Sequence, residues 1–156
     1  MKDYSSHVGI VGGGIAGLTA GCALRLQGIE TIVFERSEKM NEYGAGISIS
    51  PNGSGLLEKL GIKDSLMNES FSPSRVVMSH LNKEIISMET EVITASRQNL
   101  IKVIHQRYLK LGGEILFNHE CSSLDQGACE ITFSNDKTYK VMHALACDGI
   151  KSTIRK

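Results

Sequence analysis

The stretch from His7 to Gly17, HVGIVGGGIAG, places a glycine-rich loop between a short apolar strand and the start of a helix. Apolar residues continue at helical spacing to Gln27, and Gly28 lies where a glycine commonly ends a helix. A second apolar strand, TIVFE, follows at 31–35. A strand, a helix and a strand within about 30 residues predict a βαβ unit, in which the strands are parallel and the crossover is right-handed.

The loop has the pattern G-x-G-x-x-G, formed by Gly12, Gly13, Gly14, Ile15, Ala16 and Gly17. In this pattern the first glycine permits a tight turn, the second admits a pyrophosphate to the backbone, and the third brings the helix close to the sheet. Glu35 ends the second strand, where a carboxylate can bind ribose hydroxyls and disfavours a 2′-phosphate. The pattern predicts a dinucleotide with unphosphorylated adenosine, either FAD or NAD. The alternative is a glycine-rich turn beside a solvated glutamate.

The rest of the chain predicts further strands, helices and two hairpins. Strands are expected at 45–50, 75–80, 84–89, 114–118, 129–134, 138–144 and 145–149, and helices at 51–61 and 97–111. Turns at 81–83 and 135–137 join the two hairpins. Ser50 and Ser96 are expected to cap the two helices. The final stretch, ACDGIKSTIRK, is expected to form an Asp-Gly turn and the first turn of a helix.

The composition argues against several classes of function. Seventeen basic residues balance seventeen acidic ones, which gives no sign of a nucleic-acid or acidic-membrane partner. The four cysteines form no C-x-x-C pair and the five histidines are scattered, so free thiols in a reducing cytoplasm are favoured over a metal site. No apolar run approaches the ~18 residues of a membrane span, and MKDYSSH lacks the apolar core of a signal peptide. We expect a cytoplasmic protein without a nucleic-acid or membrane partner.

Five stretches together resemble one family: GIVGGGIAGL, VFERS, GAGISISPNG, SRQNL and CDGIKSTIR. They resemble the group A FAD-dependent monooxygenases, the aromatic hydroxylases that include salicylate-hydroxylase-like enzymes, kynurenine monooxygenase and zeaxanthin epoxidase. The resemblance implies an α/β, Rossmann-like FAD/NAD(P)-binding fold with a parallel sheet plus antiparallel hairpins. Residues 1–156 would be an FAD-binding domain, with 71–93 forming part of a substrate-domain hairpin.

The resemblance also implies roles for individual residues around FAD. The glycine-rich loop would contact the pyrophosphate, Glu35 the adenosine ribose, and Arg36 would lie near the adenosine. The segment 44–47, with Gly46, would pass the flavin, although without the resemblance an ordinary mobile loop would be the better interpretation. Arg97 would reach the ribityl or phosphate region, a role that suits a planar guanidinium. The alternative for Arg97 is a surface residue in a first helical turn.

The stretch DGIKSTIR matches the family pattern D-G-x-x-S-x-x-R. The match implies that Asp148 and Gly149 lie beside the pyrophosphate, that Asp148 is linked to use of the nicotinamide cofactor, and that Ser152 and Arg155 support the turn. Cys147 stands where alanine is usual, and we expect it to pack rather than to do redox chemistry.

For function, the resemblance implies an enzyme that uses NAD(P)H and O₂ to hydroxylate or epoxidise a small organic, usually aromatic, substrate on FAD. No catalytic residue is assigned. The family's later Gly-Asp motif has no match, so the fold is expected to be truncated before the rest of the substrate domain. A non-catalytic or weakly FAD-binding module is therefore a second hypothesis. A classical NAD dehydrogenase is a third, but it leaves GAGI, Arg97 and DGIKSTIR unexplained.

The hairpin at 75–88 carries apolar residues that would normally pack against later elements. They are Val76, Val77, Ile85 and Ile86. Because open strand edges promote association, we expect the chain to self-associate through exposed strand edges.

Overall fold

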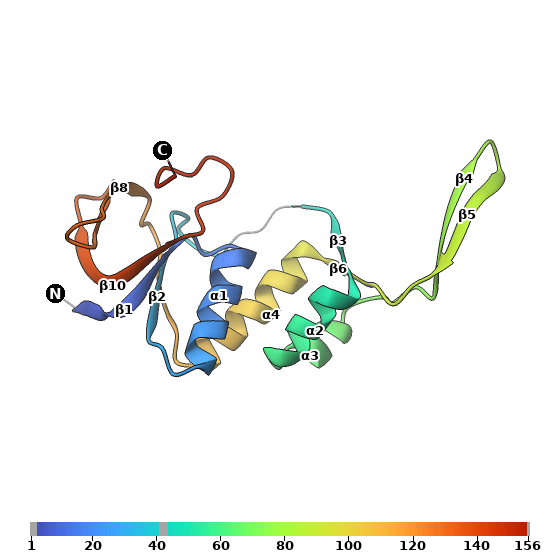
Figure 1. Cartoon of the computed structure of the whole chain (residues 1–156), viewed down its shortest axis with the longest axis horizontal. Helices are drawn as coiled ribbons and strands as arrows, with labels where there is room; N and C mark the ends of the chain where they lie inside the picture. Colours follow the sequence, from blue (N-terminus) through green and yellow to red (C-terminus); the bar gives the residue numbers. More distant parts are fainter. Residues whose placement is uncertain (1–2, 41–43, 156) are drawn as a thin grey trace. The chain divides into compact units, whose positions relative to one another are not determined.

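The computed structural model describes residues 3–40 and 44–155 (Figure 1). Its elements are β1 (Tyr4–Val11), α1 (Ile15–Leu26), β2 (Thr31–Phe34), β3 (Gly46–Ile49), α2 (Pro51–Lys59), α3 (Lys63–Met67), β4 (Arg75–His80), β5 (Lys83–Glu89), β6 (Ile93–Ser96), α4 (Arg97–Lys110), β7 (Glu114–Leu116), β8 (Cys121–Asp125), β9 (Glu130–Phe133) and β10 (Thr138–Ala146). They form two compact units, Met1–Glu42 with Ile104–Lys156, and Tyr43–Val103. Within the described ranges, no helix has the length and apolar character needed to span a membrane.

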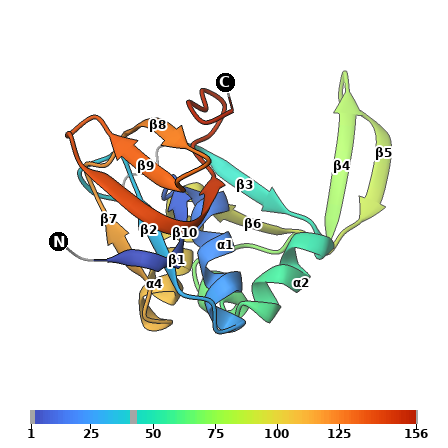
Figure 2. The ribbon, with the colours of Figure 1, turned by 60° about the vertical axis from the view of Figure 1, so that its left-hand side comes forward.

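The first unit is built on a six-stranded sheet in the order β7-β2-β1-β10-β9-β8, which Figure 2 shows with α1 packed on one face. Strand β1 lies in the middle and pairs in parallel with both β2 and β10, and β2 pairs in parallel with β7. Strands β8 and β9 add an antiparallel pair at the other edge. The α/β class with a parallel sheet plus antiparallel hairpins, predicted from the sequence, is confirmed.

Strand β10 differs from the prediction of two separate strands at 138–144 and 145–149. It is one strand that ends at Ala146, and it pairs at residues 138–140 with antiparallel β9 and at residues 141–146 mainly with parallel β1. Nothing local separates the two halves, because no turn residue interrupts YKVMHALA. The first half pairs with β9 across a short turn, whereas the second half pairs with β1, more than 100 positions away in the sequence.

The core of this unit gathers aromatic rings from β1, β2, β9 and β10. Phe34 lies 4.7 Å from Phe133 and 5.4 Å from Tyr139, measured between ring centroids, and Tyr4 stands edge-on to Phe34. All four residues of β2 are buried, as expected for a parallel strand covered on both faces. Aromatic pairs at such spacings add about 0.5–1.5 kcal/mol each to the burial of their surface.

Tyr108, on the last turns of α4, joins the helices to the sheet. Its ring is fully buried. Its hydroxyl lies 3.0 Å from Thr31 Oγ1, 3.1 Å from the Thr31 carbonyl and 3.3 Å from the Glu114 carbonyl. Helical spacing in the sequence predicts an apolar stripe of Leu100, Ile104, Tyr108 and Leu111; the first three are buried and Leu111 is half-buried. The helix packs through this stripe because its members recur every three or four residues.

The second unit combines the antiparallel pair β3–β6, the helices α2 and α3 and the hairpin β4–β5. Ser96 caps α4 as predicted, since its hydroxyl accepts the Asn99 N–H at 3.0 Å. Ser50 occupies the N-cap position of α2, but its side chain makes no capping hydrogen bond. The sequence did not predict α3 and β6, which have five and four residues. Elements this short carry too few residues for a clear periodicity.

The hairpin β4–β5 extends from the base of this unit as a two-stranded arm (Figure 1). Its turn contains two residues rather than the three predicted, because Lys83 already belongs to β5 and pairs with His80. Leu81 and Asn82 both have positive φ, 48° and 62°. Positive φ at both central residues is typical of the type I′ turn that suits twisted strands.

Candidate functional site

The glycine-rich loop lies at the carboxyl end of β1, between the two strands that flank it. The Gly12 N–H donates to the Phe34 carbonyl at 2.8 Å, and the Cys147 N–H donates to the Val11 carbonyl at 2.8 Å. Gly12 has φ +108°, and a Cβ there would lie 2.3 Å from the Cys147 carbonyl oxygen. Only glycine fits this position, so the tight turn predicted for Gly12 is explained by both conformation and space.

Helix α1 starts directly after this turn and comes unusually close to it. A Cβ on Gly17 would lie only 1.9 Å from the Gly12 carbonyl oxygen, which is why the third glycine of the pattern is needed. Gly14 is the N-cap in extended conformation and accepts the Leu18 N–H at 3.0 Å. Among the described residues no side chain caps this helix end, and its first turn contains no acidic residue. The N–H groups and the positive end of the helix dipole therefore face an anion-binding position.

Glu35 ties the end of β2 to the loop. Its carboxylate accepts the Gly13 N–H at 2.6 Å through Oε2 and the Ser37 N–H at 2.9 Å through Oε1. Each oxygen retains acceptor capacity, because a carboxylate offers about four lone-pair positions. The structure thus brings Glu35 together with the loop, while its neighbour Arg36 is exposed. Ser37 was not singled out from the sequence; the VFERS stretch was the only signal there.

His119 is a further residue that sequence reasoning did not identify. Its backbone N–H donates to the Glu35 carbonyl at 2.9 Å and so fixes the backbone that carries Glu35. Its ring Nδ1 lies 2.6 Å from the Phe117 carbonyl. The ring is buried among Phe34, Phe133 and Tyr139, and its Nε2 has no hydrogen-bond partner among the described residues. A single buried histidine has no sequence pattern that would have revealed this position.

Asp148 follows β10 on the opposite side of the loop from Glu35. Its Oδ2 accepts the N–H groups of Thr153 at 2.7 Å and Ile154 at 3.4 Å. Burial alone would raise the pKa of the Asp148 carboxyl, but hydrogen bonds from the Ser152 hydroxyl and from these N–H groups outweigh it and lower the pKa. The carboxylate is therefore ionised at neutral pH and organises its own turn.

The other positions of D-G-x-x-S-x-x-R complete this turn. Gly149 has φ +86°, the Ser152 hydroxyl accepts the Arg155 N–H at 3.1 Å, and the Arg155 guanidinium donates to the Ile150 carbonyl at 2.9 Å. The expected helical turn after Asp-Gly is wrong, because residues 150–155 form turns and bends. Side chains take the backbone N–H groups here and organise a compact loop instead of a helix.

Cys147 contributes to the site through its backbone. Its carbonyl fills the space beside Gly12, and its side chain is half-buried. Burial raises the pKa of the Cys147 thiol, and the nearby Asp148 carboxylate raises it further. A thiol kept protonated is a poor nucleophile, in line with the packing role expected for this residue.

Gly46 and Arg97 belong to the second unit and lie close to each other there. Gly46 opens β3 and pairs with Ser96, the residue that precedes Arg97. The Arg97 N–H donates to the Ala45 carbonyl at 3.4 Å, and a Cβ on Gly44 would lie 2.8 Å from Arg97 Cδ. The GAGI segment therefore runs along the start of α4 because glycine leaves room for the arginine stem. No group of three His, Cys, Asp or Glu side chains suited to a metal ion occurs in the described part of either unit.

Comparison with known proteins identifies the family. The family described as FAD binding domain matches residues 5–156. FAD-dependent monooxygenase OpS4 of Beauveria bassiana is 36% identical over 163 residues, covering 96% of this chain and 38% of that protein. Hispidin-3-hydroxylase of Neonothopanus nambi is 30% identical over 168 residues, covering 99% and 40%.

A solved structure agrees with these relatives. The tetrameric form of 2-methyl-3-hydroxypyridine-5-carboxylic acid oxygenase superposes with a TM-score of 0.91 at 27% identity, covering 97% of this chain and 41% of that one. This chain thus spans about 40% of the length of the proteins it matches. Because the family match extends over nearly every residue, the chain belongs to the FAD-binding domain family.

Proposed function

We propose that this chain is the FAD-binding part of a flavin-dependent monooxygenase. The observation that carries the proposal is the loop after β1, where an uncapped helix end, a backbone without Cβ atoms and a carboxylate meet. This arrangement fits the two ends of an adenosine diphosphate group. The helix end suits the pyrophosphate, and Glu35 suits the ribose hydroxyls but repels a 2′-phosphate.

The loop also limits which donors serve the pyrophosphate. The Gly13 N–H already donates to Glu35 at 2.6 Å. We therefore assign pyrophosphate binding to the N–H groups at Gly14 and the first turn of α1, flanked by the turn at Asp148 and Gly149. The proposal further assigns Arg36 to the neighbourhood of the adenosine, and Gly46 and Arg97 to the flavin and ribityl region.

Bound FAD would supply the redox chemistry with NAD(P)H as reductant and O₂ as oxidant, leaving the protein to bind, orient and exclude water. The substrate would be a small, usually aromatic, organic molecule, as the names of relatives such as hispidin-3-hydroxylase suggest. We assign residues 1–156 to the FAD-binding domain and 71–93 to a hairpin of the substrate-binding part. We also propose a cytoplasmic protein that self-associates through exposed strand edges; one structural relative is described as tetrameric.

The test is a titration of the purified chain with FAD, monitored by flavin fluorescence. The affinity for FAD is compared with the affinity for NAD. We expect FAD to bind in preference to NAD. Glu35→Ala and Arg97→Ala should each raise the FAD dissociation constant about tenfold, the size of effect of one hydrogen bond to a charged group. Glu38→Ala, an exposed carboxylate in the same segment, serves as the control. Unchanged affinity in both variants would refute the residue assignments, and absence of FAD uptake would refute the proposal.

A second candidate is a module that binds FAD without turnover. It is favoured by the contacts described around the loop, which suit binding of a dinucleotide and include no residue assigned to the chemistry of turnover. The two candidates differ in one measurement, the oxidation of NAD(P)H by the FAD-loaded chain with aromatic substrate present. Stoichiometric formation of an oxygenated product identifies the enzyme, and FAD uptake without product identifies the module.

A further inference from the structure

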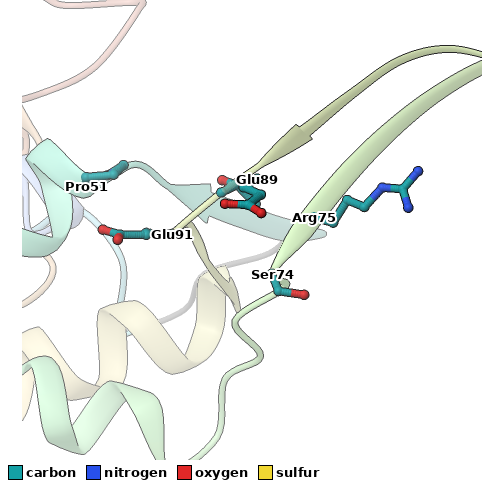
Figure 3. Close-up of a pocket in the computed structure, with 6 residues that line it drawn as sticks. Pro51, Ser74, Arg75, Glu89 and Glu91 are labelled. Carbon is teal, nitrogen blue, oxygen red and sulfur yellow. The ribbon is translucent and has the colours of Figure 1, made fainter.

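The Glu35 carboxylate is held by the chain through both of its oxygens. It is half-buried and accepts the N–H groups of Gly13 and Ser37. Glu89 and Glu91, which line a cavity of about 800 Å³ at the base of the hairpin β4–β5, are by contrast exposed (Figure 3). A side chain that is already oriented loses less freedom when a ligand binds. Whatever fixes the backbone of Glu35 therefore contributes to its fit to a ribose.

The backbone at Glu35 is fixed by the segment that follows β7. The Glu35 carbonyl accepts the His119 N–H at 2.9 Å, and the Ser37 carbonyl accepts the Asn118 N–H at 3.0 Å. Successive N–H groups of a regular strand point to opposite sides. Here both point to the residues after β2, because Asn118 has φ +57°. Left-handed backbone is uncommon for a residue other than glycine and persists only where neighbouring groups support it.

The imidazole of His119 supports this bend. Its Nδ1 lies 2.6 Å from the Phe117 carbonyl, and because a carbonyl only accepts, Nδ1 carries the proton and donates the hydrogen bond. The bond links the two neighbours of Asn118 and so closes the bend. The ring centroid lies 5.0 Å from that of Phe133 and 5.6 Å from that of Tyr139. The core therefore holds the imidazole in the orientation that the bond requires.

Packing alone does not explain a histidine at this position. The second ring nitrogen, Nε2, is buried without a hydrogen-bond partner among the described residues, which lowers stability relative to an apolar ring. The Nδ1 bond is the contribution for which an imidazole is better than such a ring. We propose that His119 is a positioning residue, which acts through the bend at Asn118 to align the Glu35 carboxylate with the adenosine ribose. The identity of the ligand rests on the proposed function, whereas the alignment is a property of the chain without ligand.

Two substitutions separate the Nδ1 bond from the packing of the ring. His119→Phe keeps an aromatic ring but removes the donor. His119→Asn loses the ring but keeps a donor, because asparagine Nδ2 and histidine Nδ1 are both bonded to Cγ. We expect His119→Phe to be the more stable variant in urea unfolding but the weaker binder of FAD, with a dissociation constant raised at least about threefold and no more than in Glu35→Ala. The same order in both measurements would show a role in packing alone and overturn the proposal.

Amide hydrogen exchange, measured by NMR without FAD, tests the alignment directly. The Glu35 carboxylate protects the Gly13 and Ser37 N–H groups. His119→Phe should raise their exchange rates at least about tenfold, whereas His119→Asn should keep them near the wild-type rates. The Gly12 N–H, which donates to the Phe34 carbonyl, is the control for a general loss of stability. Unchanged exchange at Gly13 and Ser37 in His119→Phe would overturn the proposal, even in a chain that takes up no FAD.

A variant outside the core keeps the proposal testable if the His119 variants do not fold. The exposed Asn135 donates through Nδ2 to the Asn118 carbonyl at 2.8 Å and accepts the Lys137 N–H through Oδ1. Asn135→Asp removes only the donor, so it should loosen the same bend and raise exchange at Gly13 and Ser37 with little loss of stability. Wild-type exchange in Asn135→Asp would contradict the role of the bend.

The double variant Glu35→Ala/His119→Phe distinguishes this inference from the proposed function. If His119 acts through Glu35, the double variant should bind FAD no more weakly than Glu35→Ala alone. Additive weakening would show that His119 acts elsewhere and overturn the proposal. If Glu35→Ala leaves FAD affinity unchanged, the assigned ribose contact is wrong, and amide exchange alone then decides whether His119 aligns the carboxylate.

Discussion

Gly17→Ala separates the packing of the glycine-rich loop from ordinary helix propensity. Alanine at a helix position is about 1 kcal/mol more favourable than glycine. At Gly17, however, the added Cβ would lie 1.9 Å from the Gly12 carbonyl oxygen, about 1.5 Å short of an ordinary contact at 3.4 Å. That oxygen belongs to the turn held by the Gly12 N–H to Phe34 bond, so it cannot yield without moving the loop.

Overpacking commonly costs 1–3 kcal/mol, and here the contacted atom is backbone, so we take about 3 kcal/mol. After the gain in helix propensity, Gly17→Ala should lower the free energy of unfolding by about 2 kcal/mol, which corresponds to a Tm lower by about 4–8 °C. FAD affinity should fall by at least about tenfold, because the displaced carbonyl shifts the loop that binds the pyrophosphate.

The matched control is Gly55→Ala. Gly55 is also helical, but a Cβ there would meet no atom within 4 Å. It should raise stability by about 0.5–1 kcal/mol and leave FAD affinity unchanged. Urea unfolding followed by circular dichroism gives the two free energies, and flavin fluorescence gives the affinities. If Gly17→Ala is as stable as Gly55→Ala, the close approach of α1 to the loop is not a constraint and the reasoning fails.

Three further predictions concern individual side chains. Asp148→Asn should lower stability by about 1 kcal/mol at pH 7; since the folded pKa is lowered, this difference should vanish as the pH of urea titrations falls below about 4. Burial raises the pKa of Tyr4 to about 12, so the free energy of unfolding should fall as the pH rises from 10 to 12, where the tyrosine ionises in the unfolded chain before it ionises in the folded one. In alkaline unfolding scans, Tyr4→Phe should remove this loss of stability. Tyr108→Phe should cost about 1–3 kcal/mol in urea unfolding, because it leaves buried carbonyls with fewer donors; an unchanged midpoint would contradict this.

Much of the fold was predictable where the signal is local. The βαβ unit, the Ser96 cap and the hairpin β4–β5 each depend on residues within a few turns of one another, and all three are confirmed. Strand β10 was divided wrongly, because its second half pairs with β1 at the other end of the chain. Strand β8, CSSLD, was missed although its partner β9 follows after a short turn, because its sequence has no apolar alternation.

The sequence by itself determined the glycine-rich turn and its carboxylate, because conformation at Gly12 and the spacing to Glu35 are properties of a single βαβ unit. Only the tertiary structure decided that the Cys147 carbonyl fills the space beside Gly12, that Glu35 holds the Gly13 N–H, and that Asp148 organises a loop instead of a helix. These contacts involve residues at the carboxyl ends of β1, β2 and β10, which the parallel sheet places side by side. No local pattern contains that information, because β1 and β10 meet only after the sheet has formed.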